Sequence, residues 1–326
     1  MTVVITGATG HIGANLVRAL TSNGRPVRCL VHKHTAALAG LNVEQVHGDV
    51  CDVESLYNAF KGADVVYHLA AVISLSMADW PKLEKINVQG PRNVVEACRR
   101  AGVRRLVHFS SIHAYAQEPL SVPIDESRAM SDTVKSPPYD RSKCAGELIV
   151  REAIKDGLNA VIINPTAVLG PYDFGPSHQG QAVLSIAKNE LPALVDGGFD
   201  WVDVRDVVAG AMRAVEIAPS GSRYLLSGHW ASVCDIAQII GEINGALEKK
   251  FVCPLWLARA GAPLMEGYSK MSGRRPLFTS MSLRSLNSNK NISHARAARE
   301  LGYAPRPFRQ TLEDTLRWFQ ENGKLA

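Results

Sequence analysis

The chain of 326 residues is predicted to adopt a doubly wound α/β fold, in which helices cover both faces of a parallel sheet. In the first half of the sequence, short runs of β-branched and apolar residues alternate with stretches of helical period. This alternation is typical of βαβ units, which build parallel sheets buried on both faces. A glycine-rich segment, TGATGHIG at 6–13, stands between the first strand-like run and the first helical stretch.

The predicted elements follow one another in a regular order up to about residue 165. The strand-like runs are TVVIT at 2–6, VRCLV at 27–31, a third run just before HGDVCD at 47–52, DVVYHLA at 64–70, RLVHFSS at 105–111 and NAVIINP at 159–165. The helical stretches lie between them, at about 14–22, 53–61, 80–101 and 140–155. A later run, RYLLSG at 223–228, predicts one more strand that returns to the sheet.

The alternation breaks after Thr166, where glycine and proline become frequent. These residues stand at positions 170, 171, 175, 176, 180, 192, 197 and 198. Because glycine and proline mark turns and loops, we expect a second, smaller and loop-rich region here. The predicted division is a sheet domain of residues 1–165, joined by about 200–228, and a C-terminal region of residues 166–199 and 229–326.

The composition is that of an ordinary globular protein, with 46% hydrophobic and 21% charged residues. No stretch reaches the roughly 18 uninterrupted apolar residues that a membrane helix needs. The net charge of +5 comes from scattered basic residues, so we expect neither a nucleic acid nor a membrane as partner. The six cysteines form no CxxC pair and the N-terminus lacks an export signal, which together predict reduced thiols in a cytoplasmic protein without a metal site.

Gly7, Gly10 and Gly13 of the glycine-rich segment predict a dinucleotide-binding turn. Glycines at this spacing permit a tight turn, let the backbone approach a pyrophosphate and allow the helix to pack closely on the strand. The N-terminus of the following helix attracts negative charge. The alternative is a glycine-rich turn that binds nothing, and the position of the segment inside a βαβ unit favours the cofactor.

Two further segments fit a cofactor at the carboxyl edge of the sheet. Asp49 could accept a hydrogen bond from an adenine amino group while Val50 flanks the ring; a turn aspartate that caps the next helix is an equal alternative. HLAA at 68–71 ends the fourth strand in small apolar residues, where open α/β sheets bind ligands. Close packing of strand against helix explains those residues equally well.

The segment SPPYDRSKCAGE at 136–147 places Tyr139 and Lys143 four positions apart in a predicted helix. Residues at this spacing share a face, so the ammonium could favour the ionised phenol and lower its pKa from about 10. Such a tyrosine can act as a general acid or base. A solvated surface pair is the alternative, but Ser110 and Ser111 end the fifth strand at the same edge and could bond a substrate oxygen.

In this order and spacing, TGxxGxxG, HLAA, SSxxxY and YxxxK resemble the extended form of the short-chain dehydrogenase/reductase superfamily, and the resemblance covers essentially the whole chain. The segments NVQGPRNVVEAC at 87–98, YDRSKCAGE at 139–147, NPTAVLGPYD at 164–173 and WVDVRDVVAG at 201–210 are most similar to the dihydroflavonol-4-reductase-like branch. Relatives of that branch are known as NAD-dependent epimerase/dehydratase family proteins. The resemblance implies a Rossmann sheet that binds the dinucleotide and a C-terminal region that binds the substrate.

The resemblance also implies roles for individual residues. Tyr139 would be the catalytic acid or base, and Lys143 would hold the nicotinamide ribose and depress the pKa of the tyrosine. Ser111, rather than the preceding serine, would polarise the substrate oxygen, and Asn87 would be a structural or proton-relay residue. The residues implied to contact the cofactor are Gly7, Thr9, Gly10, His11, Ile12, Gly13, His32, Lys33, Asp49, Val50, Leu69, Ala70, Ala71, Tyr139, Lys143, Pro165, Thr166, Val168 and Ser177.

The choice between NADP and NAD is predicted from the residues after the second strand. An acid there usually binds the ribose hydroxyls of NAD, whereas a cation binds the 2′-phosphate of NADP. This chain has His32 and Lys33 and no acid, which favours NADP. The related branch commonly has arginine where His32 stands, so NAD remains the alternative.

The same scaffold serves reductases, epimerases and dehydratases. Sugar-nucleotide dehydratases carry an acidic pair where this chain has Ile112 and His113, which argues against dehydration. An epimerase would need arginines for a nucleotide diphosphate, and candidates are Arg205, Arg274, Arg275 and Arg284. The apolar composition of the second region instead favours a carbonyl compound of medium size. The aromatic and methionine side chains of this region are Tyr172, Phe174, Trp256, Met265, Tyr268, Met271, Phe278 and Met281.

The sequence therefore predicts a hydride-transferring oxidoreductase that interconverts a carbonyl and a secondary alcohol on a largely apolar small molecule. An epimerase with tightly held NAD and a dinucleotide-binding sensor are the alternatives. Related proteins often dimerise through a four-helix bundle, so a homodimer is also expected. The apolar positions that could serve it are Val94, Val95, Ala97, Leu148, Ile149 and Ile154.

Overall fold

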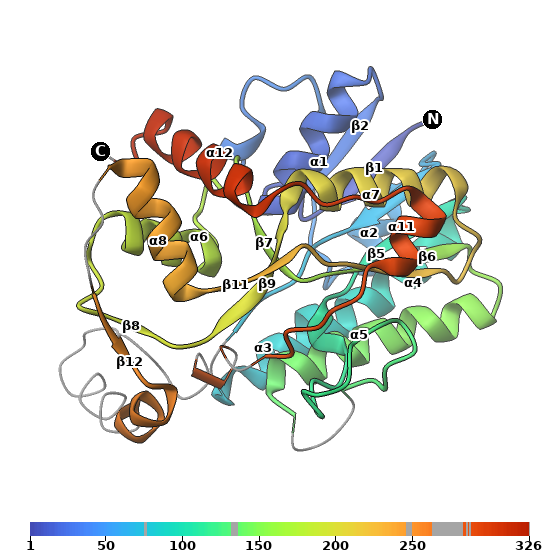
Figure 1. Ribbon diagram of the computed structural model, residues 1–326. Helices are drawn as coiled ribbons and strands as arrows, with labels where there is room; N and C mark the ends of the chain where they lie inside the picture. Colours follow the sequence, from blue (N-terminus) through green and yellow to red (C-terminus); the bar gives the residue numbers. More distant parts are fainter. Residues whose placement is uncertain are drawn as a thin grey trace.

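A seven-stranded parallel sheet forms the centre of the larger lobe in the computed structural model (Figure 1). The structure describes residues 1–74, 77–131, 136–245, 250–262, 283–284, 286 and 288–325. The strand order is β10-β6-β5-β4-β1-β2-β3, and each neighbouring pair is parallel. The strands are β1 (Val3–Thr6), β2 (Val27–Val31), β3 (Glu44–His47), β4 (Val65–His68), β5 (Arg105–Phe109), β6 (Ala160–Pro165) and β10 (Arg223–Leu226). The doubly wound α/β prediction is confirmed.

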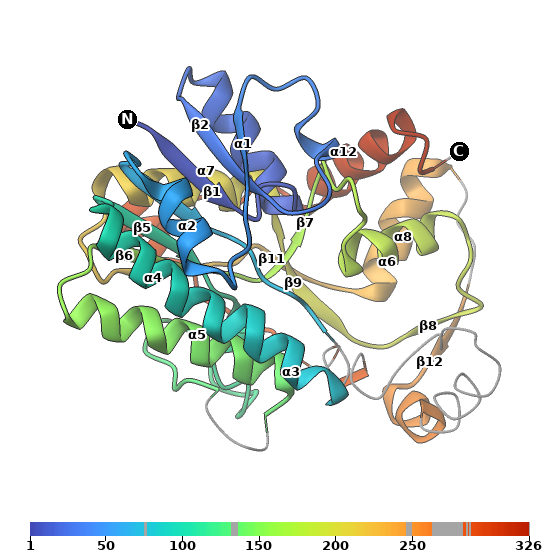
Figure 2. The same cartoon turned by 180° about the vertical axis from the view of Figure 1, so that it is seen from behind.

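Helices cover both faces of this sheet. Figure 2 shows one layer, formed by α2 (Val53–Phe60), α4 (Gly90–Ala101) and α5 (Pro138–Lys155). The opposite layer contains α1 (His11–Ser22), α7 (Val204–Ile217) and α11 (Ala295–Leu301). Strand β10 pairs with β6 in the register Arg223↔Ile162, so the run at 223–228 returns to the sheet as predicted.

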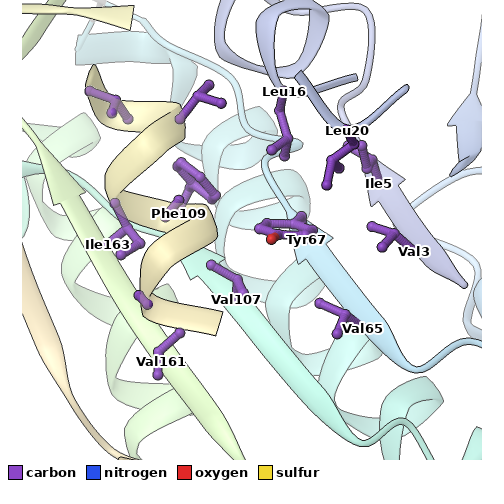
Figure 3. Close-up of a cluster of buried hydrophobic side chains, with 14 of the residues drawn as sticks. Val3, Ile5, Leu16, Leu20, Val65, Tyr67, Val107, Phe109, Val161 and Ile163 are labelled. Atoms are coloured by element: carbon purple, nitrogen blue, oxygen red, sulfur yellow. The ribbon is translucent and has the colours of Figure 1, made fainter. Parts of the chain in front are cut away.

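Alternation of side chains along the strands separates two apolar cores. Odd-numbered residues of β1, β4, β5 and β6 pack against α1 and α7, as Figure 3 shows for Ile5, Tyr67, Phe109 and Ile163. Even-numbered residues such as Val66 and Ile162 pack against α2, α4 and α5. Because side chains of a strand point to opposite faces in turn, continuous apolar runs are required to bury both faces.

The remaining elements form a smaller lobe beside the carboxyl edge of the sheet (Figure 1). A three-stranded sheet contains β11 (His229–Ser232), β9 (Gly198–Asp203) and β7 (Ala167–Leu169), and β12 (Phe251–Cys253) pairs with β8 (Ala193–Val195). Helices α6 (His178–Ala187), α8 (Val233–Asn244) and α12 (Phe308–Glu321) pack on it. The second region therefore contains more regular structure than its glycine and proline content predicts, because short strands fit between the turns.

Several element boundaries differ from the sequence-based expectation. Helix α1 begins at His11, since Gly10 occupies the N-cap position. The stretch predicted as one helix at 80–101 consists of α3 (Trp80–Leu83), the π-helical η3 (Glu84–Gln89) and α4. Strands β4 and β5 end at His68 and Phe109, so the segments LAA and SS follow their strands instead of ending them. Short 3-10 turns are η1 (Ala36–Leu38), η2 (Met77–Asp79) and η4 (Ile112–Ala114).

The positions proposed for a dimer interface are used within the chain itself. Val94, Val95 and Ala97 are buried in the core against the sheet, and Ile149 and Ile154 pack partly on the same core. The homodimer therefore stays a prediction that would need other residues of α4 and α5. All six cysteines lie among the described residues and carry no disulfide. In the described part of the chain, no helix has the length and apolar character to cross a membrane.

Replacement of Ile163 by alanine tests the central core. Ile163 is fully buried between the sheet and α7, so Ile163→Ala should lower the free energy of unfolding by about 2–5 kcal/mol through lost burial and an incompletely filled cavity. Ile217→Ala is the matched control, because Ile217 is 44% exposed. Chemical denaturation measures both. Equal losses for the two variants would contradict the assigned core.

Candidate active site

The turn between β1 and α1 lies directly against the chain that follows β4. Gly7 has a φ of 73°, and a Cβ atom built there would lie 2.6 Å from the backbone nitrogen of Ala70. A Cβ at Gly13 would overlap the carbonyl oxygen of Gly7. Only glycine permits both the left-handed conformation and these close approaches. The turn is thereby drawn into the edge of the sheet, beside Leu69, Ala70 and Ala71.

The N-terminus of α1 has the properties of an anion site. Its N-cap, Gly10, is exposed and makes no side-chain hydrogen bond, and the first turn contains no acidic residue. The backbone N–H groups of that turn, which includes Ile12, are therefore not capped by a side chain of the helix. Partly exposed Thr9 precedes the cap. This cradle fits the pyrophosphate of a dinucleotide.

The side chain of His11 binds the loop after β7. Its Nε2–H donates to the carbonyl oxygens of Gly170 and Pro171 at 3.1 and 3.2 Å. Asn15 Nδ2 donates to the same Pro171 oxygen at 2.9 Å. These bonds fasten the loop after β7 to α1, so the backbone of His11 is the part that remains for a phosphate.

His32 and Lys33 are exposed at the carboxyl end of β2, near Asp49. His32 Nε2 lies 4.0 Å from Asp49 Oδ2. The Asp49 carboxylate accepts from the backbone N–H of Cys51 at 2.9 Å, and this bond lowers the pKa of Asp49. Helix α2 is capped by Asp52, which accepts from Glu54 N. Asp49 therefore does not cap the helix, and its carboxylate lies beside His32.

Ser111 and Tyr139 meet at the carboxyl end of β5. A hydrogen bond joins the Ser111 hydroxyl and the Tyr139 phenol, and Ser111 Oγ also accepts from the backbone N–H of His113 at 3.2 Å. Burial raises the pKa of Tyr139; the Ser111 bond opposes this effect and the Asp140 carboxylate adds to it. Near neutral pH the phenol accordingly keeps its proton. Ser110 is buried, and its hydroxyl has no hydrogen-bond partner in the described part of the chain.

Lys143 lies one helical turn after Tyr139 and is buried under the sheet edge. Its Nζ donates to the carbonyl oxygen of Phe109 at 2.9 Å. Burial lowers the pKa of Lys143 to about 8, and the Glu147 carboxylate opposes this shift. The predicted lowering of the Tyr139 pKa is not what the structure shows, because burial of the phenol dominates and the ammonium is held by the backbone of β5.

Asn87 joins the segment after β4 to helix α5. Its Oδ1 accepts from the backbone N–H of Val72, and its Nδ2 donates to the Val72 carbonyl and to Ser142 Oγ, at 2.8, 2.8 and 2.9 Å. A Cβ at Gly146 would overlap the Asn87 carbonyl oxygen, so the two segments touch through backbone. These contacts fit the structural one of the two roles considered for Asn87.

A histidine and an aspartate beside Tyr139 were not recognised as a pair from the sequence. His113 Nδ1 lies 3.0 Å from Asp140 Oδ1, and the imidazole stands edge-on to the Tyr139 ring with a centroid separation of 5.4 Å. The two residues are 27 positions apart, and only the fold brings η4 against the start of α5. Their one sequence signal is that each adjoins a motif, SSIHAY or YDRSK.

The remaining predicted cofactor residues lie on β6, β7 and the start of α6. Pro165 ends β6, and Val168 is half-buried in β7. Thr166 Oγ1 donates to Asp200 Oδ1 at 2.7 Å. Ser177 caps α6 by accepting from Gly180 N, and its hydroxyl donates to Asp173 Oδ2 at 2.8 Å. The hydroxyls of Thr166 and Ser177 are therefore engaged within the protein. Val50 is buried against α4 beside Gly90.

Of the apolar side chains considered for substrate binding, Tyr172 and Phe174 pack against Trp318 of α12, at centroid separations of 6.1 and 5.2 Å. Arg18 lies over both rings. These two side chains therefore serve packing between α1, the loop after β7 and α12. Trp256 is exposed, and Met265, Tyr268, Met271, Phe278 and Met281 lie outside the described residues, as do Arg274 and Arg275.

Comparison with known proteins identifies relatives along the full chain. The sequence model described as NAD dependent epimerase/dehydratase family matches residues 3–226. Sterol demethylase protein B of Methylococcus capsulatus is 38% identical over 330 residues, which cover all of both chains. A proposed dihydroflavonol 4-reductase of Synechocystis is 32% identical over 325 residues, covering 98% of this chain and 94% of the relative. The solved structure of gox2253 has a TM-score of 0.87 and 32% identity, covering 100% of this chain and 99% of that one.

Alanine at two glycines should separate cofactor binding from folding. Gly10→Ala places its Cβ 3.4 Å from the nearest protein atom, so it should leave the melting temperature nearly unchanged while weakening NADPH binding about tenfold or more, because the methyl group enters the anion cradle. Gly13→Ala should also lower the melting temperature, since its Cβ overlaps the Gly7 carbonyl. Gly175→Ala, where nothing lies within 4 Å, is the control. Fluorescence titration and thermal unfolding measure both effects; wild-type binding by Gly10→Ala would contradict the cradle.

Proposed function

Because the chain belongs to the NAD-dependent epimerase/dehydratase family, we propose that it is an NAD(P)-dependent oxidoreductase of the extended short-chain dehydrogenase/reductase type. It interconverts a carbonyl group and a secondary alcohol on a medium-sized, largely apolar substrate. The observation that carries this proposal is the meeting of Ser111 with the Tyr139 phenol at the carboxyl edge of the sheet, with Lys143 one turn further along α5 and bound to the Phe109 carbonyl of β5.

The two hydroxyls suit proton transfer at a single substrate oxygen. In the direction of reduction, Tyr139 gives its proton to the oxygen, and Ser111 donates a hydrogen bond that stabilises the charge developing there. The raised pKa of Tyr139 keeps this proton in place near pH 7. In the direction of oxidation, the phenolate receives the alcohol proton. The nicotinamide, when bound, supplies or accepts the hydride. Lys143 is the residue placed to donate to the ribose hydroxyls.

Two observations support an apolar substrate: the name of one relative, and the engagement of a candidate phosphate-binding arginine within the protein. The relative that is 38% identical over all of both chains is named for sterol demethylation, and sterols are large apolar alcohols. Arg205, one candidate for a nucleotide diphosphate, is bound to Asp203 and Asp314 at 2.7 and 2.8 Å. A guanidinium held by two carboxylates at a helix start serves folding and is not available to a sugar nucleotide.

A nucleotide-sugar epimerase with tightly held NAD is the alternative, and the family description includes epimerases. Such an enzyme would use the same Tyr139 and Lys143. Arg284 is exposed, and no carboxylate of the described residues forms an ion pair with it. A sensor that binds the dinucleotide without turnover would not need Ser111, Tyr139 and Lys143 together, and this chain has all three.

We also propose NADP as the preferred cofactor. His32 and Lys33 are solvent-exposed where β2 ends, and β2 is not followed by an acid that would bind ribose hydroxyls. An exposed ammonium next to an imidazole attracts the 2′-phosphate of NADP.

Tyr139→Phe tests the catalytic assignment. The variant should lose at least about 100-fold in kcat for carbonyl reduction, because the proton donor is removed, and should still bind the cofactor. Tyr57→Phe, on the outer helix α2, is the matched control and should retain wild-type rates. Alicyclic and aromatic ketones are screened by loss of nicotinamide absorbance. No turnover of any ketone by the wild type, combined with interconversion of a nucleotide sugar, would favour the epimerase.

Lys33→Ala tests the preference for NADP. Loss of the ammonium should raise the Kd of NADPH about tenfold and leave that of NADH nearly unchanged, because the cation faces only the 2′-phosphate. Lys82→Ala removes an exposed lysine on α3 and controls for the change in net charge. Fluorescence titrations at one fixed ionic strength give both constants. A parallel change for the two cofactors would contradict the assignment.

A further inference from the structure

One turn beyond Lys143, helix α5 buries a carboxylate that the reaction described above does not use. Glu147 has no exposed surface, and its position four residues after Lys143 places both side chains on the face of α5 that meets the sheet. Removal of a carboxylate from water is costly unless charges or hydrogen bonds compensate it. The partners of Glu147 therefore show what this carboxylate holds.

Glu147 is connected to the backbone of the catalytic serine. Its Oε2 accepts from Asn164 Nδ2 at 2.7 Å. The same Asn164 nitrogen donates to the carbonyl oxygen of Ser111 at 3.2 Å. Asn164 stands on β6, and Ser111 follows β5. The carboxylate thus reaches from the helix of Tyr139 and Lys143, through one amide, to the segment that carries Ser111.

A second cation shares the carboxylate. Arg223 of β10 approaches Glu147 Oε1 at 3.8 Å and donates to the Tyr115 hydroxyl at 3.3 Å and to the Glu126 carbonyl at 2.7 Å. Glu126 is also buried, and its own carboxylate accepts from the backbone N–H of Leu225. Glu147 therefore faces the guanidinium of Arg223, whereas the Glu126 carboxylate is engaged by the backbone of β10.

On the sheet side, the groups near Lys143 provide no counter-charge. His68 of β4 and His108 of β5 are register neighbours with ring centroids 5.5 Å apart, and both are buried. His68 Nδ1 lies 2.7 Å from Thr6 Oγ1. Burial lowers the pKa of His68 to about 3 and that of His108 well below its usual value, so both rings are neutral in the physiological range. Glu147 is the acid that acts on Lys143 in the described part of the chain.

We propose that Glu147 is a positioning residue of the active site, whose buried carboxylate keeps Lys143 in its ammonium form and, through Asn164, fixes the backbone of Ser111. This inference rests on the proposed oxidoreductase function and assigns a part to a residue outside the tyrosine, lysine and serine set. A charged Lys143 donates three hydrogen bonds, of which Phe109 uses one, so the remaining donors serve the cofactor ribose.

The direction of the expected effect follows from the charges. With Glu147 in place, the pKa of Lys143 is about 8, below its usual value because of burial. Removal of the negative charge leaves burial unopposed, so the pKa falls further and the ammonium is lost at a lower pH. Activity that needs the ammonium should therefore decline earlier as the pH rises.

Glu147→Gln keeps the size and the hydrogen-bonding capacity of the side chain while removing its charge. We expect the alkaline limb of kcat/KM for ketone reduction to move down by about one pH unit, so the ratio of wild-type to variant kcat/KM grows about tenfold between pH 6 and pH 9. Glu147→Asp should restore most of the wild-type profile. Glu152→Gln, an exposed glutamate on the same helix, is the control. A uniform decrease at every pH would overturn the proposal and make Glu147 merely structural.

Asn164→Ala separates the two parts of the proposal. This variant keeps the carboxylate and breaks the link to Ser111, so kcat should fall while the alkaline limb stays in place. If the alkaline limb of Asn164→Ala moves as far as that of Glu147→Gln, the shift does not come from the charge of Glu147, and the proposal is overturned. If Glu147→Gln fails to fold, Arg223→Gln gives the opposite test, because removal of the competing cation should move the limb to higher pH; an unmoved limb there would equally overturn the proposal.

A readout independent of turnover distinguishes failure of this inference from failure of the proposed function. Protein labelled with 13C at the lysine ε-carbons reports the titration of Lys143 by NMR, with the signal assigned from Lys143→Arg. The Glu147→Gln protein should titrate about one unit lower than the wild type. An unchanged titration refutes the role of Glu147, whereas a shifted titration in an enzyme that reduces no ketone refutes only the oxidoreductase reaction.

Discussion

The hydrogen bond from Lys143 to the Phe109 carbonyl, buried between α5 and the edge of the sheet, is the contact on which the site depends. It ties the helix that carries Tyr139 to the strand that leads to Ser111, so the phenol and the serine hydroxyl meet at one point. An ammonium in such a place is stable only with a counter-charge, and Glu147 supplies it from the same helix. The residues of the candidate site and the residues that pack α5 on the sheet therefore lie on the same buried face of α5.

The proton affinity of Tyr139 is affected by burial and by two neighbouring side chains. Asp140 favours the protonated phenol and is bonded to His113. One turn further along the same helix, Glu147 raises the pKa of buried Lys143 and burial lowers it. Ser111 contacts the phenol directly and favours its ionised form. The pKa of Tyr139 is therefore set jointly by burial, by Ser111 between β5 and η4, and by Asp140 on α5.

The glycine-rich turn has a separate role: its shape leaves backbone N–H groups at the start of α1 accessible, as a bound pyrophosphate would require. At Gly7 and Gly13, a Cβ atom would overlap the protein backbone, so only glycine fits. At Gly10, a Cβ atom would meet no protein atom closer than 3.4 Å and would instead occupy the anion cradle. The same sheet edge continues through Ala70 to the segment that Asn87 holds against α5. The segment after β4 therefore contacts the glycine-rich turn at Ala70 and helix α5 through Asn87. Small residues are needed at the first contact, and the amide of Asn87 makes the second.

The sequence by itself determined the fold class, the glycine turn and the placement of Ser111, Tyr139 and Lys143 at one sheet edge, because strand and helix periods and short motifs are local and parallel strands end on a common side. Only the tertiary structure decided that His11, Thr166 and Ser177 spend their side chains on packing and capping, that His113 pairs with Asp140, and that Glu147 reaches Ser111 through Asn164. Such pairs join residues far apart in the chain, and burial, which sets their protonation, is a property of the folded chain alone.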